Sequence, residues 1–200
     1  MNESELIAAS QKGQLGAFNH LVLAYQQMVY NTAYRLLGDR DAAADASQEA
    51  FLAAFQAIKS FRGGSFRAWL LRIVTNACYD QLRAKKRRPT TSLDALLVDA
   101  SENSYPSRMV SPDNHVMRRE LQAELQRGLL SLPEEQRLVV ILSDVQGLSY
   151  EEIATATNTN LGTVKSRLSR ARAKLRDFLL DQEELLPGRY RLINKDDLAE

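Results

Sequence analysis

Residues 129–175 read LLSLPEEQRLVVILSDVQGLSYEEIATATNTNLGTVKSRLSRARAKL, and this stretch decides the fold of the C-terminal half. It contains the start and stop signals of three consecutive helices. Pro133 marks the first helix start, because a proline without an N–H is tolerated there, and Gly147 ends that helix. Ser149 opens a short second helix as part of a capping box with the glutamate three residues on. The turn 157–160 leads into the third helix, since its asparagines adopt left-handed backbone or cap a helix.

The third helix is amphipathic, with an apolar stripe on one side and a basic face on the other. The stripe recurs at helical spacing and consists of Val164, Leu168, Ala171 and Leu175. Residues 165–176 hold six basic residues and no acid. Two short helices, a tight turn and a basic second helix are typical of a helix-turn-helix, whose second helix enters the DNA major groove. A solvated basic face on an ordinary surface helix is the alternative, but the capping box, the turn and the single sign of charge together favour DNA binding.

Length and composition set the broad class of the protein. A chain of 200 residues suits one large or two small domains, with enough apolar residues for their cores. No apolar run approaches the roughly 20 residues that span a bilayer, and the N-terminus lacks the pattern of a signal peptide. Cys78 is the only cysteine, which excludes an internal disulfide and a cysteine-based zinc site. We therefore expect a cytoplasmic protein without membrane insertion, and we expect no metal or other cofactor.

The net charge of +1 hides two basic segments. Residues 62–88 carry eight basic residues and a single acid, and residues 165–176 form the second segment. Two basic segments in an otherwise acidic chain indicate two contacts with nucleic acid rather than general attraction to polyanions.

Residues 4–61 are expected to be helical, with a stop at Gly38 and a new alanine-rich helix from Asp39. The expected buried side of this second helix carries Phe51, Phe55 and Ile58, with Ala44 and Ser47 at the same azimuth. An adjacent, mostly polar stripe is either a partner surface or a plain solvated face. It consists of Asp41, Asp45, Gln48 and Leu52, with Glu49 beside it.

A second candidate contact lies on the helix expected from Phe66 to about Arg83. Ser65 can cap this helix, and the loop FRGGS at 61–65 precedes it. The expected core residues are Trp69, Leu70, Ile73, Val74 and Ala77. One arc has cations for phosphates and side chains that hydrogen-bond or stack on unpaired bases. This arc carries Arg72, Asn76, Tyr79, Arg83 and Lys86, and the alternative is an ordinary amphipathic helix with a basic end.

Residues from Pro89 to about Asn114 are rich in Ser, Thr, Asp, Pro and Asn, which indicates a linker between two domains. We place the domains at 1–88 and 116–180, the linker at 89–115 and an acidic tail at 181–200. The predicted fold is all-α, with two small helical domains joined by a flexible linker.

This arrangement resembles a bacterial RNA polymerase sigma factor of the extracytoplasmic-function (ECF) type, in the sigma-70 superfamily. GDRDAAADASQEAFLAAF at 38–55 resembles region 2.2 of that family, and FRAWLLRIVTNACYDQLRAKKRR at 66–88 resembles regions 2.3 and 2.4. The motifs LPEEQR, GLSYEEIA and GTVKSRLSRARAKL, in that order within 132–175, resemble region 4.

The resemblance implies a promoter-specificity subunit that binds the β′ clamp helices and the β subunit of the polymerase core. It also implies control by an anti-sigma factor and three sets of contact residues. The polymerase set is Asp45, Gln48, Glu49 and Leu52. The set for the single-stranded −10 element, whose loop takes in a flipped base, is Phe61, Arg62, Ser65, Phe66, Arg72, Asn76, Tyr79, Asp80, Arg83 and Lys86. The set for the duplex −35 element is Lys165, Ser166, Arg167, Ser169, Arg170, Arg172 and Lys174.

Two other functional classes remain as alternatives to the sigma factor. A free-standing helix-turn-helix regulator would use residues 1–90 to sense a ligand or to dimerise, but the second basic segment disfavours it. An enzyme is also disfavoured, because His20 and His115 are isolated and no nucleophile–base constellation stands out.

Overall fold

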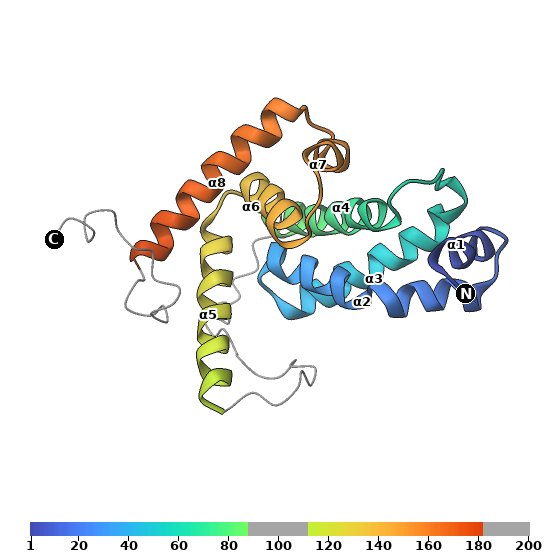
Figure 1. Ribbon diagram of the computed structural model, residues 1–200, viewed down its shortest axis with the longest axis horizontal. Coiled ribbons are helices and arrows are strands. Elements are labelled where there is room, and N and C mark those ends of the chain that lie inside the picture. Colours follow the sequence, from blue (N-terminus) through green and yellow to red (C-terminus); the bar gives the residue numbers. More distant parts are fainter. Residues whose placement is uncertain (88–111, 182–200) are drawn as a thin grey trace.

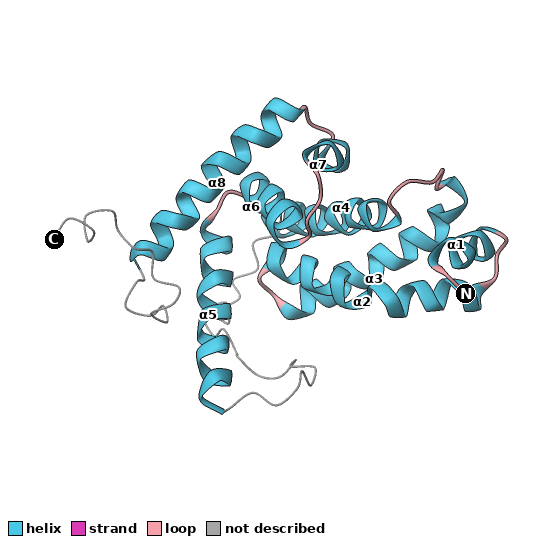
Figure 2. Cartoon of the chain, in the orientation of Figure 1, coloured by secondary structure: helices cyan, strands magenta, loops and turns pink. Residues whose placement is uncertain are grey.

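The structure, a computed structural model, describes residues 1–87 and 112–181, with side chains described from residue 120 in the second range. All regular secondary structure in these ranges is helical, which confirms the predicted all-α class (Figure 2). Most of the predicted linker lies outside the described residues, but residues 112–115 belong to the first turn of a helix. The predicted acidic tail lies outside them beyond Asp181. Within the described ranges, no helix is long and apolar enough to cross a membrane.

The N-terminal domain is a helical bundle in which α2, α3 and α4 lie alongside one another and α1 lies across one end (Figure 1). Its elements are α1 (Glu3–Gln11), α2 (Leu15–Leu37), α3 (Arg40–Ala57), the 3-10 turn η1 (Ile58–Ser60) and α4 (Phe66–Arg87). Local signals set the helix ends. Gly38 ends α2 at a φ of 72°, as the sequence predicted, and the Asp39 carboxylate accepts a hydrogen bond from Ala42 N at 2.9 Å to open α3.

The buried side of α3 is made of alanines, so the prediction was right for Ile58, which is 2% exposed just after α3, but wrong for Phe55. The fully buried residues are Ala43, Ala46, Ala50 and Ala54. Phe55 is 38% exposed and Phe51 is half-buried, while Ala44 is exposed. Alanines leave room for α2 and α4 to approach closely, and the aromatic rings lie at the edge of this contact. There Phe55 packs edge-on against Phe18, with ring centroids 5.0 Å apart.

The core of α4 is rotated slightly from the expected one. Leu70 and Val74 are buried as predicted, but Leu71 and Cys78 join them, while Trp69, Ile73 and Ala77 are only half-buried. Burial raises the pKa of the Cys78 thiol to about 12. The single cysteine is therefore a protonated core side chain and offers no thiolate for redox chemistry.

The C-terminal domain follows the start and stop signals of the sequence. Its elements are α5 (Pro112–Ser131), α6 (Glu134–Val140), the π-helical turn η3 (Ile141–Val145), α7 (Tyr150–Thr157) and α8 (Leu161–Asp181). Pro133 precedes α6, and the Ser149–Glu152 capping box opens α7. The π-helical turn was not predicted; it continues α6 directly, and Gly147, whose φ is 67°, lies two residues after its end.

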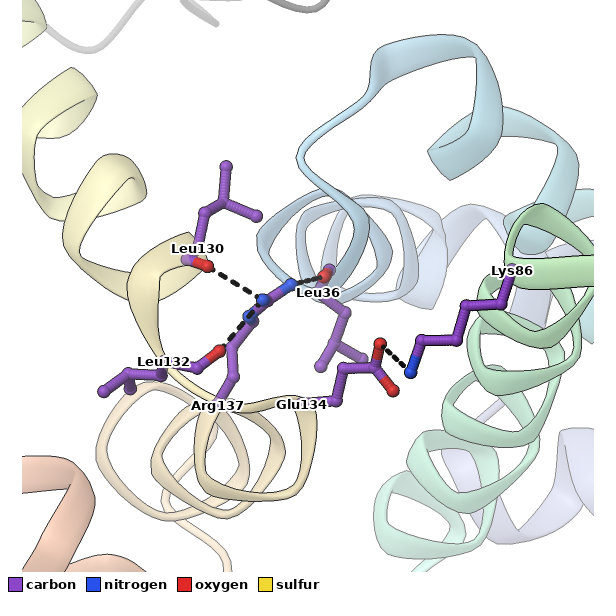
Figure 3. Close-up of polar contacts among 6 residues, drawn as sticks. All are labelled: Leu36, Lys86, Leu130, Leu132, Glu134 and Arg137. Atoms are coloured by element: carbon purple, nitrogen blue, oxygen red, sulfur yellow. Dashed lines mark hydrogen bonds and ion pairs between the residues drawn. The ribbon is translucent and has the colours of Figure 1, made fainter. Parts of the chain in front are cut away.

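The two domains contact each other through apolar side chains that share one buried cluster and through a set of hydrogen bonds and an ion pair. The Arg137 side chain, 8% exposed, donates hydrogen bonds to the carbonyl oxygens of Leu130 and Leu132, each at 3.0 Å, and to that of Leu36 at the end of α2 (Figure 3). Lys86 Nζ lies 2.9 Å from Glu134 Oε1 in the same view. These contacts hold the first turn of α6 against the ends of α2 and α4.

Further contacts extend this interface along α2 and α4. Gln146 Nε2 donates to Thr32 Oγ1 at 3.0 Å, and Gln146 Oε1 accepts from the Arg67 guanidinium at 2.9 Å. Gly38 faces Leu130 so closely that a Cβ at this position would lie 2.6 Å from Leu130 Cδ1. Gly38 is thus favoured by its left-handed backbone, and a larger residue there would have to displace the end of the Leu130 side chain.

Candidate nucleic-acid interface

α7 and α8 form the helix-turn-helix that the sequence predicted. Asn158 ends α7 in the left-handed conformation, at a φ of 51°, and Thr163 N donates to Asn160 Oδ1 at 2.7 Å at the start of α8. Val164 and Leu168 are buried on the inner side of α8. The opposite side of α8 therefore faces away from the domain.

The outer side of α8 carries most of the residues predicted for the −35 element. The exposed ones are Lys165, Ser169, Arg170, Arg172 and Lys174. Ser166 is half-buried, and its hydroxyl donates to Thr163 O at 3.0 Å. Arg170 has the reach and the planar donor pair that bidentate contact with a guanine edge requires.

Two of the predicted −35 residues are engaged by acids of the same domain. Arg167 is paired with Glu135 of α6, and its side chain is only 20% exposed. Arg172 donates to both carboxylate oxygens of Asp144, at 2.6 and 3.0 Å. These hydrogen bonds hold the pKa of the Asp144 carboxyl below its usual range. Arg172 therefore braces α8 against η3 as well as facing solvent.

The residues of α4 predicted for the −10 element differ in their exposure and in the side chains they contact. Arg72 and Asn76 are exposed, and Arg83 is exposed but paired with Asp80 at 3.2 Å. Lys86 is also exposed but pairs with Glu134 of α6, and Tyr79 is half-buried near the same turn. Burial, with a smaller effect of the Glu135 charge, raises the pKa of Tyr79 to about 12.

The loop before α4 has an ordered base and an open tip. The Phe61 ring packs against Trp69 at 5.4 Å, and Ser65 Oγ accepts a hydrogen bond from Ala68 N at 3.1 Å. Gly63 and Gly64 have φ values of 98° and 86°, with open space around them. Phe66, predicted as a −10 contact, is only 2% exposed. Its ring forms the base of the loop and is not presented to solvent, because it begins α4 over the core.

The predicted polymerase-contact residues share the outer face of α3. Asp45, Gln48, Glu49 and Leu52 are all exposed, with Leu52 at 58%. They lie away from the alanine stripe, so the packing of the bundle leaves them free.

Sequence reasoning missed the side chains that join the parts of the molecule. Arg137 directly precedes the apolar run 138–142. A charged residue at the edge of such a run was the one sequence feature that could have indicated a buried arginine. Gln146 and Gln11 gave no signal, because a glutamine in a helix is usually solvated. In the described residues, no group of three or more His, Cys, Asp or Glu side chains is arranged to hold a metal ion.

A helix-turn-helix with a basic outer face, joined to a helical bundle with a second basic helix, defines a two-domain DNA-binding protein. Family models for Sigma-70 region 2 and Sigma-70 region 4 match residues 21–88 and 122–175. The chain belongs to the ECF type of bacterial RNA polymerase sigma factors, which give the polymerase its promoter specificity.

Relatives and a solved structure support this assignment. The ECF sigma-E factor of Escherichia coli K12 is 39% identical over 86% of this chain and 91% of its own length. The ECF sigma factor SigE of Mycolicibacterium smegmatis is 38% identical over 86% of this chain but 65% of its own length. The sigma factor RpoE of Bartonella quintana, solved in complex with the anti-sigma factor NepR, has a TM-score of 0.63 and 31% identity. That match covers 81% of this chain and 96% of the solved one.

Proposed function

We propose that this sigma factor directs the polymerase core to promoters by dividing DNA recognition between its two domains. The outer side of α8 reads the duplex −35 element through Lys165, Ser169 and Arg170. The 61–65 loop and the exposed part of α4, with Arg72 and Asn76, take the non-template strand of the −10 element. The exposed basic side of α8 is the observation that carries this proposal, because its cations face solvent with no acid on the same helix face between 165 and 176.

The outer face of α3 is the proposed contact with the core enzyme. Asp45, Gln48, Glu49 and Leu52 offer carboxylates, an amide and an apolar centre that suit a helical, partly basic partner such as the β′ clamp helices. The C-terminal domain would reach the β subunit, and the chain would contribute no catalysis of its own. Control by an anti-sigma factor is also proposed, since the similar sigma factor of Bartonella quintana is bound to one.

The test combines purified full-length protein, sigma-free bacterial core polymerase and a library of genomic DNA fragments. Transcript starts that share a −35/−10 pair support the proposal and supply the recognition sequence. Tight, specific duplex binding by the protein alone, without a complex with the core, would favour the free-standing regulator.

A charge reversal separates the polymerase contact from the DNA contact. Asp45→Lys should weaken core binding at least tenfold, because it replaces an exposed carboxylate with a cation facing a basic partner. Gln26→Lys, on the exposed side of α2, adds a cation to another face of the same domain and should leave core binding unchanged. Equal core affinity of the Asp45 variant and the wild type would reject the α3 assignment.

A further inference from the structure

α1 lies against the segment that leads into the 61–65 loop. The Gln11 side chain, at the end of α1, donates through Nε2 to Ile58 O at 3.2 Å and to Phe61 O at 2.9 Å. One carbonyl belongs to the first residue of η1 and the other to the residue that follows η1, which is the last helical turn before the loop. A side-chain amide has two N–H donors, so one glutamine can satisfy both carbonyls at once.

The orientation of this amide follows from its partners. Both partners are carbonyl oxygens, so the NH₂ group and not Oε1 must face them. Ile58 O also accepts from Phe61 N at 3.1 Å, which makes it a shared acceptor of the turn and of α1. Gln11 thereby fixes the direction in which the chain leaves η1.

The other end of α1 is linked to the exit of the loop indirectly, through α2. The Glu3 carboxylate accepts a hydrogen bond from the hydroxyl of Tyr25 in α2. The Tyr25 ring packs edge-on against Phe66, with centroids 5.4 Å apart, and Phe66 is the first residue of α4. α1 therefore contacts the entry of the loop directly through Gln11 and reaches its exit only through Tyr25.

The tip of the loop has no comparable support. Arg62, Gly63 and Gly64 are exposed, and a Cβ on either glycine would meet no atom within 4 Å. The position of the tip is therefore determined by where its two ends are held. The entry carries the Phe61 ring, which lies 5.6 Å from Phe66 and 5.4 Å from Trp69.

We propose that Gln11 is a positioning residue for the 61–65 loop, and that through this loop it sets the recognition of one base of the −10 element. The inference rests on the proposed function of the loop. It concerns a helix outside the matched Sigma-70 region 2, which begins at residue 21. Gln11 acts on DNA only through the backbone it holds and does not itself touch a base.

The experiment compares full-length wild-type protein with Gln11→Glu and Gln11→Met in transcription with core polymerase. The templates are the cognate promoter and a set with every single-base change in the −10 element. Gln11→Glu places a carboxylate against two carbonyl oxygens, and Gln11→Met keeps the length but loses both donors. We expect both variants to reduce the discrimination at one −10 position by roughly tenfold, the effect of losing two hydrogen bonds. Core affinity and discrimination at the −35 element should stay at wild-type values.

Gln14→Glu is the matched control. Gln14 is exposed, lies three residues away and makes no side-chain capping hydrogen bond, so the same new charge there faces solvent. Its discrimination should equal that of the wild type. Trp69, the single tryptophan, reports on the loop in the free protein. Its fluorescence should be quenched more readily by acrylamide in the Gln11 variants and not in the Gln14 variant.

The outcomes separate this inference from the proposed function. Wild-type discrimination in Gln11→Met, at unchanged melting temperature, would overturn the positioning role while leaving −10 recognition intact. A uniform loss of initiation on every template, with no change at a single −10 position, would also overturn it. A wild-type protein that is indifferent to every −10 change would overturn the proposed role of the loop itself.

Discussion

The two DNA-contact faces differ in which domain supplies their acidic partners. On α8, Lys165, Ser169 and Arg170 face solvent, and Arg167 and Arg172 pair with acids of the same domain. On α4, Lys86 is exposed but pairs with Glu134 of the other domain, and Tyr79 is half-buried. The −35 face is thus contacted only by acids of its own domain, whereas part of the −10 face is contacted by the other domain.

The acids at the start of α6 explain this difference. Glu134 and Glu135 suit a helix N-terminus, where the dipole favours negative charge. Glu134 also pairs with Lys86, and Glu135 pairs with Arg167. Lys86, Arg167 and Arg170 line one hollow of about 460 Å³ together with these two acids. The same carboxylates therefore begin a helix and pair with cations predicted to bind DNA.

The largest effect is expected from Arg137→Ala, which removes the side chain at the centre of the domain interface. Three carbonyl oxygens lose a charged donor, so we expect the free energy of unfolding to fall by about 3 kcal/mol. The domains should also separate, because the Leu36 contact links them directly. Small-angle X-ray scattering should show a larger radius of gyration, and single-stranded −10 DNA should bind more tightly as Tyr79 is uncovered and Lys86 loses its partner Glu134.

Arg176→Ala is the control for the Arg137 variant. Arg176 is exposed on α8, where it pairs with the equally exposed Asp177. Its removal should change the free energy of unfolding by less than about 1 kcal/mol and leave the scattering curve unchanged. An unchanged curve for Arg137→Ala as well would mean that this interface does not hold the two domains together in solution.

A smaller effect is expected from Arg170→Ala, which tests the exposed −35 face. Loss of a bidentate base contact should cost about 1–3 kcal/mol of binding and relax the choice of base at one −35 position. Arg176→Ala removes a cation that already pairs with Asp177 at 2.9 Å and should weaken binding to all sequences slightly. Identical promoter selectivity of the Arg170 variant and the wild type would exclude Arg170 as a base contact.

The sequence predicted best those parts whose signals are local. The stop at Gly38, the capping box of Ser149 and the left-handed turn at Asn158 are all confirmed. Each depends on side chains within a few residues of the backbone they stabilise. The inner side of α8 was also predicted, because a single apolar stripe on a basic helix leaves one choice of buried face.

The sequence predicted less well the parts that depend on neighbouring helices. Alanine and phenylalanine are both apolar, so composition alone could not show that α3 buries Ala46 and Ala50 and leaves Phe55 at the edge. Phe66 was predicted as a DNA contact because it lies in the loop motif, yet the start of α4 places it in the core. The domain contact through Arg137 joins residues about 100 positions apart, and no short sequence pattern records such a pairing.

The smallest effect is expected from Asp144→Asn, which removes the carboxylate that pairs with Arg172 on the −35 face of α8. The ion pair is partly exposed, so unfolding should become easier by less than about 1 kcal/mol. The pKa of Asp144 is lowered in the folded state, so its contribution is fully present above the unfolded value of about 3.9 and disappears as pH falls through the lower folded value. Denaturation curves should therefore show a constant difference from the wild type near neutral pH and none in strong acid.

The released Arg172 should raise affinity for all duplex sequences, whereas Asp177→Asn, which releases Arg176 further along α8, should raise it less. Equal affinity of Asp144→Asn and the wild type would mean that Arg172 is a brace for η3 and takes no part in binding DNA.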